Sequence, residues 1–145
     1  MSPELSGAWR LRLWRRINAD GTTTFPFGEA PTGVLIYSPD GQMAVQMMAA
    51  QRPPLKGQDP LGGDVTERAR AYSTCLAYFG TYEVKDDSVI HHVDASLFPN
   101  WSNTVQVRPF SLGNGELILR TPINGDAPIN EMIFERVIPW TAAAQ

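Results

Sequence analysis

The stretch GTYEVKDDSVIHHVDASLF, residues 80–98, decides the fold because a turn signal at its centre lets its two halves be aligned. If the two central aspartates form a two-residue hairpin loop, Tyr82 pairs with His91 across the two strands. Side chains alternate between the faces of a strand, so this alignment sorts the hairpin into two faces. One face is mostly apolar and carries Gly80, Tyr82, Val84, Val89, His91, Val93, Ala95 and Leu97. The other is mostly polar and carries Glu83, Lys85, His92, Asp94 and Ser96. The pattern predicts an antiparallel sheet with one buried face.

The two histidines of the chain are neighbours in this hairpin, so they point to opposite faces. We expect His91 to point inward, opposite Tyr82, and His92 to point into water. Two histidines that bind one metal from a strand need a spacing of two, so no metal site is predicted here.

Similar strand-like runs, separated by turn signals, fill most of the remaining sequence. The turns are residues 18–21, 38–41, 113–115 and 124–127, and the runs between them are residues 10–16, 33–38, 42–48, 105–112, 116–121 and 132–138. Short strands at this spacing predict an antiparallel sandwich or barrel.

Two further turns constrain which side chains share the inner face. The Asn114-Gly115 turn pairs Phe110 with Leu119 and places Gln106 and Arg108 on the same face, unless the loop has three residues and the register slips. The turn at residues 38–41 leaves two registers open. A two-residue loop joins Val34 and Ile36 to the inward Met43, Val45 and Met47, and a three-residue loop joins Leu35 and Tyr37 to them instead.

One segment interrupts the strands. Residues 52–64 are rich in proline and glycine and predict a long loop, and residues 65–79 carry apolar residues at helical spacing. Asp64 and Glu67 have the spacing of a capping box. We expect a short helix between the fourth and fifth strands, which either edges the mouth of a barrel or plugs its end.

Composition excludes several classes of function. The chain has 145 residues, which we expect to form a single domain, residues 1–145, and a net charge of −3, which argues against a nucleic-acid binder. In the basic run at residues 10–16, we expect Arg10 and Arg12 outside and Leu11 and Leu13 inside. The single Cys75 makes neither an intramolecular disulfide nor a zinc site by itself. Without a signal-peptide pattern or an apolar run of ~18 residues, a cytoplasmic protein with no membrane partner is expected.

Several motifs together resemble the bacterial and fungal proteins that contain a lipocalin-like domain. Gly7-Ala8-Trp9 is similar to the lipocalin G-x-W motif, and Arg136 matches the arginine that packs over this tryptophan in calycin folds. The stretches GAWRL, FPFG, GVLIYSPDGQMAVQM, LAYFGTYEV and HHVDASLFPNW extend the resemblance over most of the chain. The resemblance implies a closed calycin-type antiparallel barrel of about 8–10 strands with an interior cavity, closed at its base by Trp9 and Arg136.

A binding barrel is the first functional hypothesis. Its ligand is a small, largely apolar molecule with a carbonyl, phenol or carboxylate end, because a few polar groups share the apolar inner face. The residues expected to bind it are Met43, Met47, Tyr82, His91, Trp101, Gln106, Arg108 and Phe110. A homodimer is left open.

An enzyme that uses the same cavity is the alternative. His91 would act as general acid or base, Tyr82 would donate to a developing oxyanion, and Arg108 would hold an enolate or carboxylate. The reaction would be cyclisation, isomerisation or dehydration of a small carbonyl compound, such as a polyketide-like intermediate, without a cofactor. A third interpretation is that His91 and a tyrosine form a purely structural polar pair in the core.

Overall fold

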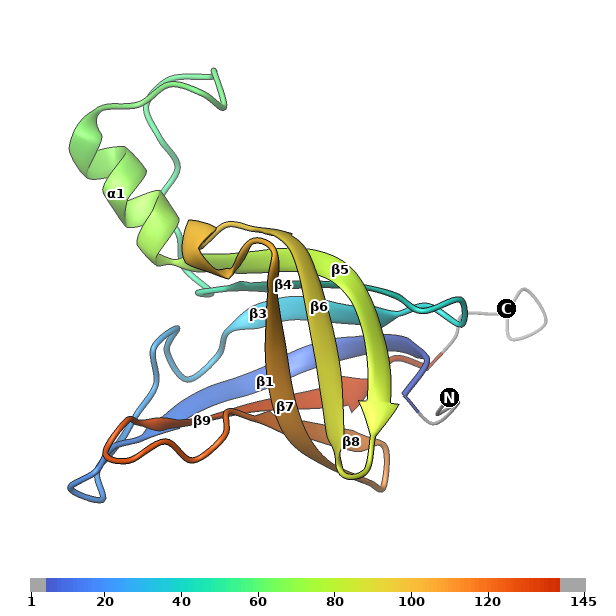
Figure 1. Ribbon diagram of the computed structural model, residues 1–145. Helices are drawn as coiled ribbons and strands as arrows, with labels where there is room; N and C mark the ends of the chain where they lie inside the picture. The colour runs from blue at the N-terminus through green and yellow to red at the C-terminus, as the bar shows by residue number, and fades with distance from the viewer. Residues whose placement is uncertain (1–4, 139–145) are drawn as a thin grey trace.

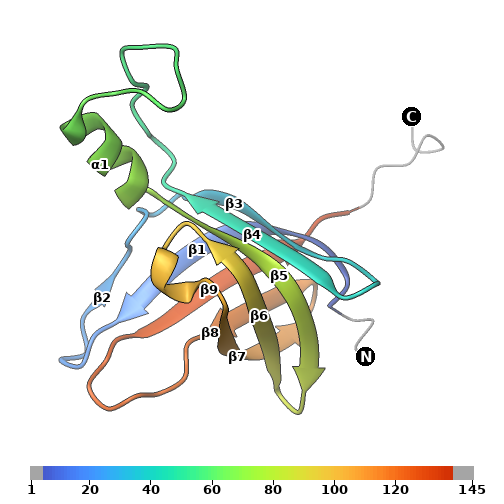
Figure 2. The same ribbon diagram turned by 45° about the horizontal axis from the view of Figure 1, so that its top comes forward.

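The computed structural model describes residues 5–138 and shows a closed antiparallel β-barrel (Figures 1 and 2). Each strand of the ring pairs with the next, and the last strand pairs back with the first. The eight ring strands are β1 (Gly7–Ile17), β3 (Thr32–Tyr37), β4 (Gln42–Met48), β5 (Cys75–Lys85), β6 (Ser88–Ser96), β7 (Thr104–Gly113), β8 (Glu116–Arg120) and β9 (Ile129–Arg136). The short β2 (Thr23–Thr24) pairs only with the end of β1. The predicted closed barrel is confirmed.

The hairpin registers follow the turn chemistry. Tyr82 pairs with His91 and Phe110 pairs with Leu119, both as predicted. At the β3–β4 turn the structure selects the second alternative, in which Tyr37 pairs with Met43. Gly41 makes this longer loop possible, because its backbone φ of 93° lies in a region that residues with a side chain rarely adopt.

A bulge in β6 corrects one part of the predicted inner face. The register of β5 and β6 shifts between Phe79 and Gly80, so Asp94 has no direct partner. Beyond it, Tyr78 pairs with Ser96, and Ala95 and Leu97 turn to the outer face. The expectation that Ala95 and Leu97 point inward is therefore wrong. Simple alternation fails here because a bulge reverses the facing of every later residue.

A second bulge lies at Arg12 in β1. Leu11 pairs with Phe134 and Leu13 pairs with the adjacent Ile133 of β9, so Arg12 is the extra residue. Arg10 and Arg12 are exposed, as expected, and Leu11 is buried. Leu13 is only partly buried, however, because Trp14 takes the inward position after the bulge.

The predicted helix is shorter than expected. Helix α1 (Val65–Ser73) begins with the predicted capping box, in which the Glu67 backbone N–H donates to Asp64 Oδ1 at 2.8 Å. It ends before Cys75, which pairs with Met48 at the start of β5, so the helical expectation for residues 75–79 is wrong. No residue of α1 is buried, and the helix stands off from one end of the barrel (Figure 1). It therefore does not plug the barrel.

The opposite end of the barrel is closed by packed side chains. The Arg136 guanidinium carbon lies 4.2 Å from the centre of the Trp9 ring, and the Trp9 indole N–H donates to the Leu5 carbonyl at 2.9 Å. Gly7 has a φ of 124°, and a Cβ there would lie 3.1 Å from the Arg136 guanidinium. This is the base closure that the resemblance implies, with a cation–π contribution of about 0.5–2 kcal/mol. Other fully buried side chains fill the barrel above it, namely Leu35, Tyr37, Val89 and Leu117.

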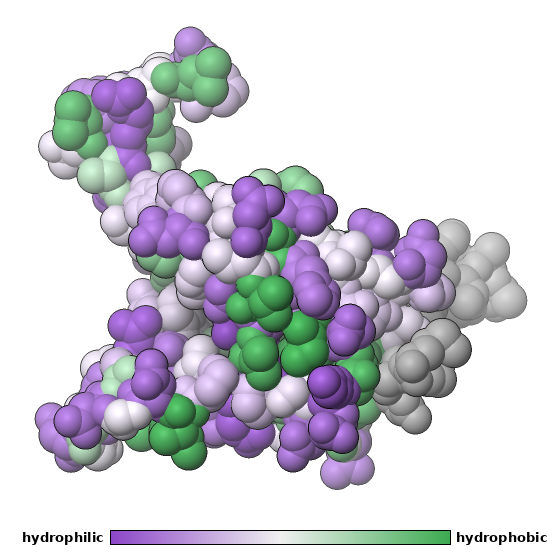
Figure 3. Space-filling model, in the orientation of Figure 1, coloured by the Kyte–Doolittle hydropathy of each residue, from purple (hydrophilic) through white to green (hydrophobic). Residues whose placement is uncertain are grey.

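The outer surface is not uniformly polar. Apolar side chains gather over β6 and β7 (Figure 3), where Val105 and Val107 are both exposed. Within residues 5–138, no helix is both long and apolar enough to cross a membrane.

Candidate functional site

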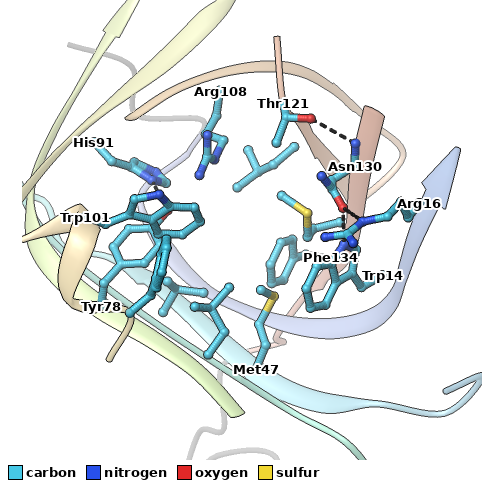
Figure 4. A pocket seen from close by; sticks show the side chains of 15 residues that line it. Trp14, Arg16, Met47, Tyr78, His91, Trp101, Arg108, Thr121, Asn130 and Phe134 are labelled. Carbon is cyan, nitrogen blue, oxygen red and sulfur yellow. Dashed lines mark hydrogen bonds between the residues drawn. The ribbon is translucent and has the colours of Figure 1, made fainter. Parts of the chain in front are cut away.

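A cavity of about 270 Å³ lies inside the barrel (Figure 4), and its lining includes Leu76, near the start of the strand that follows α1. Its volume is slightly below the range of ~300–1,000 Å³ that is usual for small-molecule pockets. Most of its wall is apolar or aromatic, formed by Trp14, Val45, Met47, Leu76, Phe98, Trp101, Leu119, Met132 and Phe134. Trp101 comes from the short helix η1 (Pro99–Trp101) that follows β6. The barrel is thus packed at one end and hollow at the other.

His91 lies at the inner end of this cavity, between two tyrosines. Its Nε2 lies 2.7 Å from the Tyr37 hydroxyl and its Nδ1 lies 2.7 Å from the Tyr78 hydroxyl. Burial, with a contribution from the nearby Arg108 charge, lowers the pKa of His91 from 6.5 to about 3. The ring is therefore neutral near pH 7, so one nitrogen donates a hydrogen bond and the other accepts one.

The position of the imidazole proton follows from the partners of Tyr37. This hydroxyl is fully buried, and the structure gives it one hydrogen bond among the described residues, to His91 Nε2. Buried hydroxyl protons normally have an acceptor, so we assign Nε2 as the acceptor and Nδ1 as the nitrogen that donates to Tyr78. In this tautomer the Tyr78 oxygen accepts from His91, and its own proton is left to donate to a molecule in the cavity.

Arg108 is the second polar group at this end. It is only 5% exposed, and its guanidinium lies 5.4 Å from the Trp101 ring centre. Burial raises the pKa of the Tyr78 phenol, and the nearby charge of Arg108 opposes the rise. Arg108 also donates to the Val107 carbonyl at 3.3 Å. Among residues 5–138, no carboxylate pairs with Arg108. A buried cation without a carboxylate partner is energetically costly, so this site favours a ligand that brings an anionic group or a hydrogen-bond acceptor.

Asn130 and its neighbours form a separate polar cluster on the opposite wall of the cavity (Figure 4). Asn130 Oδ1 accepts from the Trp14 indole N–H at 2.9 Å and from Arg16 Nε at 3.0 Å. The Asn130 backbone N–H donates to the Thr121 hydroxyl at 2.9 Å. Asn130 thus fixes the orientation of two side chains that the β1 bulge turns inward.

Four of the residues predicted to bind a ligand line the cavity and four do not. Met47, His91, Trp101 and Arg108 line it. Tyr82 and Met43 lie nearer the closed end, Gln106 donates to Thr104 at 2.9 Å, and Phe110 packs against the core. Ligand contact itself stays a prediction for all eight.

The predicted cross-strand pairing of Tyr82 with His91 is confirmed, but the two side chains do not hydrogen-bond to each other. The two residues are cross-strand neighbours, but the Tyr82 hydroxyl donates to the Ser38 carbonyl at 2.9 Å. His91 instead bonds Tyr37 and Tyr78. Register identifies the residue directly opposite on the neighbouring strand, whereas the His91 ring reaches Tyr78 further along β5 and Tyr37 on β3.

Sequence reasoning missed several residues of the cavity. Tyr78 falls within the predicted helix, although the alternation of Leu76, Tyr78 and Gly80 is a strand pattern that identifies it as an inward residue. Simple alternation along β1 does not predict that Trp14 and Arg16 point inward, because the bulge at Arg12 shifts the alternation by one residue. We find no sequence signal that marks Thr121 or Asn130.

An eight-stranded antiparallel barrel with a base-closing tryptophan and arginine, and a hollow opposite end, defines the class of small lipocalin-like barrels. The chain belongs to the family described as the lipocalin-like domain, whose family model matches residues 6–137. One relative is the 4'-hydroxy-3'-methoxypropiophenone carrier protein ppsC of Aspergillus oryzae. The two sequences are 36% identical over an alignment of 87 residues, which covers 54% of this chain and 78% of the relative.

Similar solved structures are more distant. An uncharacterized protein from Bacteroides eggerthii is 13% identical with a TM-score of 0.45, covering 91% of this chain and 98% of its own. The REP1-NXSQ fatty acid transporter is 13% identical with a TM-score of 0.47, covering 96% and 100%. A mutant of the fluorescent protein UnaG is 12% identical with a TM-score of 0.44, covering 96% and 100%. With TM-scores this low, these likenesses carry no argument about function.

Proposed function

We propose that this chain binds one small, largely apolar molecule in the barrel cavity, with a carbonyl, phenol or carboxylate oxygen directed at Arg108 and Tyr78. The observation that carries the proposal is the buried Arg108, which has no carboxylate partner in the described chain and lies at the inner end of an apolar cavity. Its N–H groups and the Tyr78 proton are donors, so they select an acceptor.

The rest of the cavity supports an aromatic or similarly flat body. Trp101, Phe98 and Phe134 offer ring faces and edges, and Met47 and Met132 adapt to irregular shapes. The relative from Aspergillus oryzae is named as a carrier of an aryl ketone, a molecule with a carbonyl oxygen on an apolar framework. A molecule of this chemical class suits the walls and the donors of the present cavity.

The geometry favours binding over catalysis. A pKa of about 3 makes His91 a weak base, and tyrosine hydroxyls occupy both of its nitrogens. A cyclase, isomerase or dehydratase in this cavity stays a prediction that no contact of the described residues favours. The described contacts of His91 are those of a structural support for Tyr78.

The test is a calorimetric titration of the protein with three probes, namely 4'-hydroxy-3'-methoxypropiophenone, 4-propylphenol and 4-phenylbutanoate. We expect the wild type to bind at least one of them with one-to-one stoichiometry. Arg108→Met should weaken this binding by about 10–100-fold, because a hydrogen bond to a charged group contributes about 1.5–3 kcal/mol. Arg10→Met, on the exposed face of β1, is the matched control and should bind like the wild type.

Removal of Arg108 should not weaken the fold, because methionine replaces a buried, unpaired charge with an apolar side chain of similar length. Thermal unfolding of the free Arg108→Met protein checks this. Wild-type binding of none of the three probes, or equal affinity of Arg108→Met and the wild type for a bound probe, would overturn the proposal.

A further inference from the structure

We propose that Arg16, Thr121 and Asn130 form a second polar anchor at the open end of the cavity, so that the preferred ligand carries an oxygen function at each end. This inference rests on the proposed binding function and adds the chemical class of the ligand to it. It names a site that is separate from the Arg108–Tyr78 pair and lies on the opposite wall (Figure 4).

The first observation is that Arg16 points inward and has no acid partner. The bulge at Arg12 places Trp14 and Arg16 on the lining of the cavity. The adjacent Arg15 ion-pairs with Glu131 at 2.6 Å, and Arg120 shares that carboxylate at 2.9 Å. No carboxylate among residues 5–138 pairs with Arg16.

The second observation is that Arg16 is held in a defined orientation. Its Nε donates to Asn130 Oδ1 at 3.0 Å, and its guanidinium carbon lies 5.7 Å from the centre of the Trp14 ring. Trp14 donates to the same oxygen at 2.9 Å and packs edge-on against Phe27, with ring centres 4.8 Å apart. The bond through Nε leaves the two terminal guanidinium nitrogens as donors for another molecule.

The third observation concerns Asn130 itself. Its side-chain oxygen accepts both of these hydrogen bonds, and its amide nitrogen lies on the cavity side (Figure 4). The structure shows no hydrogen bond from that nitrogen to any described residue. Arg16 and Asn130 together therefore present N–H donors that suit a hydroxyl, methoxy or carboxylate oxygen.

The two anchors are separated by apolar wall. Met47, Met132 and Phe134 line the same cavity as both anchors. A ligand with oxygen at one end only leaves one set of donors to water, whereas a two-ended ligand satisfies both sets. The preferred ligand class is thus a flat molecule, of the size of one substituted ring, with hydrogen-bond acceptors at opposite ends.

The test compares propiophenone, which has one oxygen, with 4-propanoylbenzoate, which adds a carboxylate at the far end of the ring. Calorimetry should show that the wild type binds the two-ended probe at least about tenfold more tightly. Arg16→Met should bring this ratio near one while leaving propiophenone affinity within about twofold. Arg16→Lys keeps the charge and should keep part of the preference. Arg15→Met, which changes the outward neighbour, should retain the full ratio.

The outcomes separate this inference from the proposed function. If the wild type binds neither probe, the second anchor is wrong, and the titration with the three earlier probes decides separately whether the binding function stands. If it binds both probes equally well, the second anchor is wrong and the binding function stands. If Arg16→Met weakens both probes by the same factor, Arg16 acts through the general structure of the cavity, and the second anchor is again wrong.

Discussion

At the scale of single residues, His91 is the group whose chemistry the barrel changes most. The folded chain holds it neutral, with a pKa of about 3, whereas the unfolded chain has the ordinary value near 6.5. Between these values the unfolded state binds a proton that the folded state does not. His91 therefore contributes stability that is fully present above about pH 6.5 and is lost as the pH falls toward 3.

His91→Gln should reduce the dependence of stability on pH. Urea unfolding of the wild type between pH 6.5 and 5 should show a steeper loss than the variant, by up to about 1.4 kcal/mol per pH unit. His92→Gln is the matched control, since His92 lies on the outer face, and this variant should keep the steep slope that the buried His91 causes. Equal slopes for the wild type and His91→Gln would contradict the burial of a neutral imidazole.

Alternation within a hairpin was enough to predict that His91 points inward and that His92 does not. The sequence also placed Arg108 inward through the Asn114-Gly115 turn. It could not identify Tyr37 and Tyr78 as the partners of His91, because Tyr78 falls in the predicted helix and Tyr37 lies on β3, which β4 and β5 separate from β6 in the sheet. The expected Tyr82 partner instead bonds a turn carbonyl.

At the scale of the elements, two bulges decide which side chains enter the cavity. The bulge at Arg12 turns Trp14 and Arg16 inward, and the bulge at Asp94 pairs Tyr78 with Ser96. Neither bulge has a strong sequence signal, so every alternation-based prediction beyond them was reversed. The predicted helix is too long for a related reason. Residues 75–79 fit a helical stripe and a strand equally well, and in the folded chain their pairing with β4 selects the strand.

Gly80→Ala should destabilise the protein far more than Gly113→Ala. A Cβ at Gly80 would lie 1.9 Å from the His92 backbone oxygen, so the β5–β6 bulge would have to move. We expect a loss of at least about 1–3 kcal/mol, which is typical of overpacking. A Cβ at Gly113, also within a strand, meets nothing within 4 Å. Urea unfolding measures both, and equal stabilities would show that the bulge does not need a glycine.

At the scale of the whole molecule, the loop and helix between β4 and β5 form an appendage to the ring. Met48 pairs directly with Cys75, so the chain leaves and rejoins the sheet at the same point. The hydrogen bonds of the appendage are largely internal, such as those from Arg52 to Thr74 and Ala71. No residue of α1 is buried.

Replacement of residues 50–73 by a two-residue Asn-Gly turn should therefore leave the barrel folded. Because loop closure costs only about 0.6 kcal/mol per doubling of loop length, we expect this shortening to raise the free energy of unfolding by no more than about 2 kcal/mol. Far-UV circular dichroism and urea unfolding measure this. Loss of cooperative unfolding would mean that the appendage is part of the core structure, contrary to its exposure.

The central claim is that the hollow end of the barrel receives an oxygen-bearing molecule at Arg108 and Tyr78. The most direct measurement is a crystal structure of the protein with bound 4'-hydroxy-3'-methoxypropiophenone. The account predicts the aryl ketone inside the barrel, with an oxygen within about 3 Å of the Arg108 guanidinium. A ketone bound on the outer surface, or one whose oxygen atoms avoid both Arg108 and Tyr78, would contradict it.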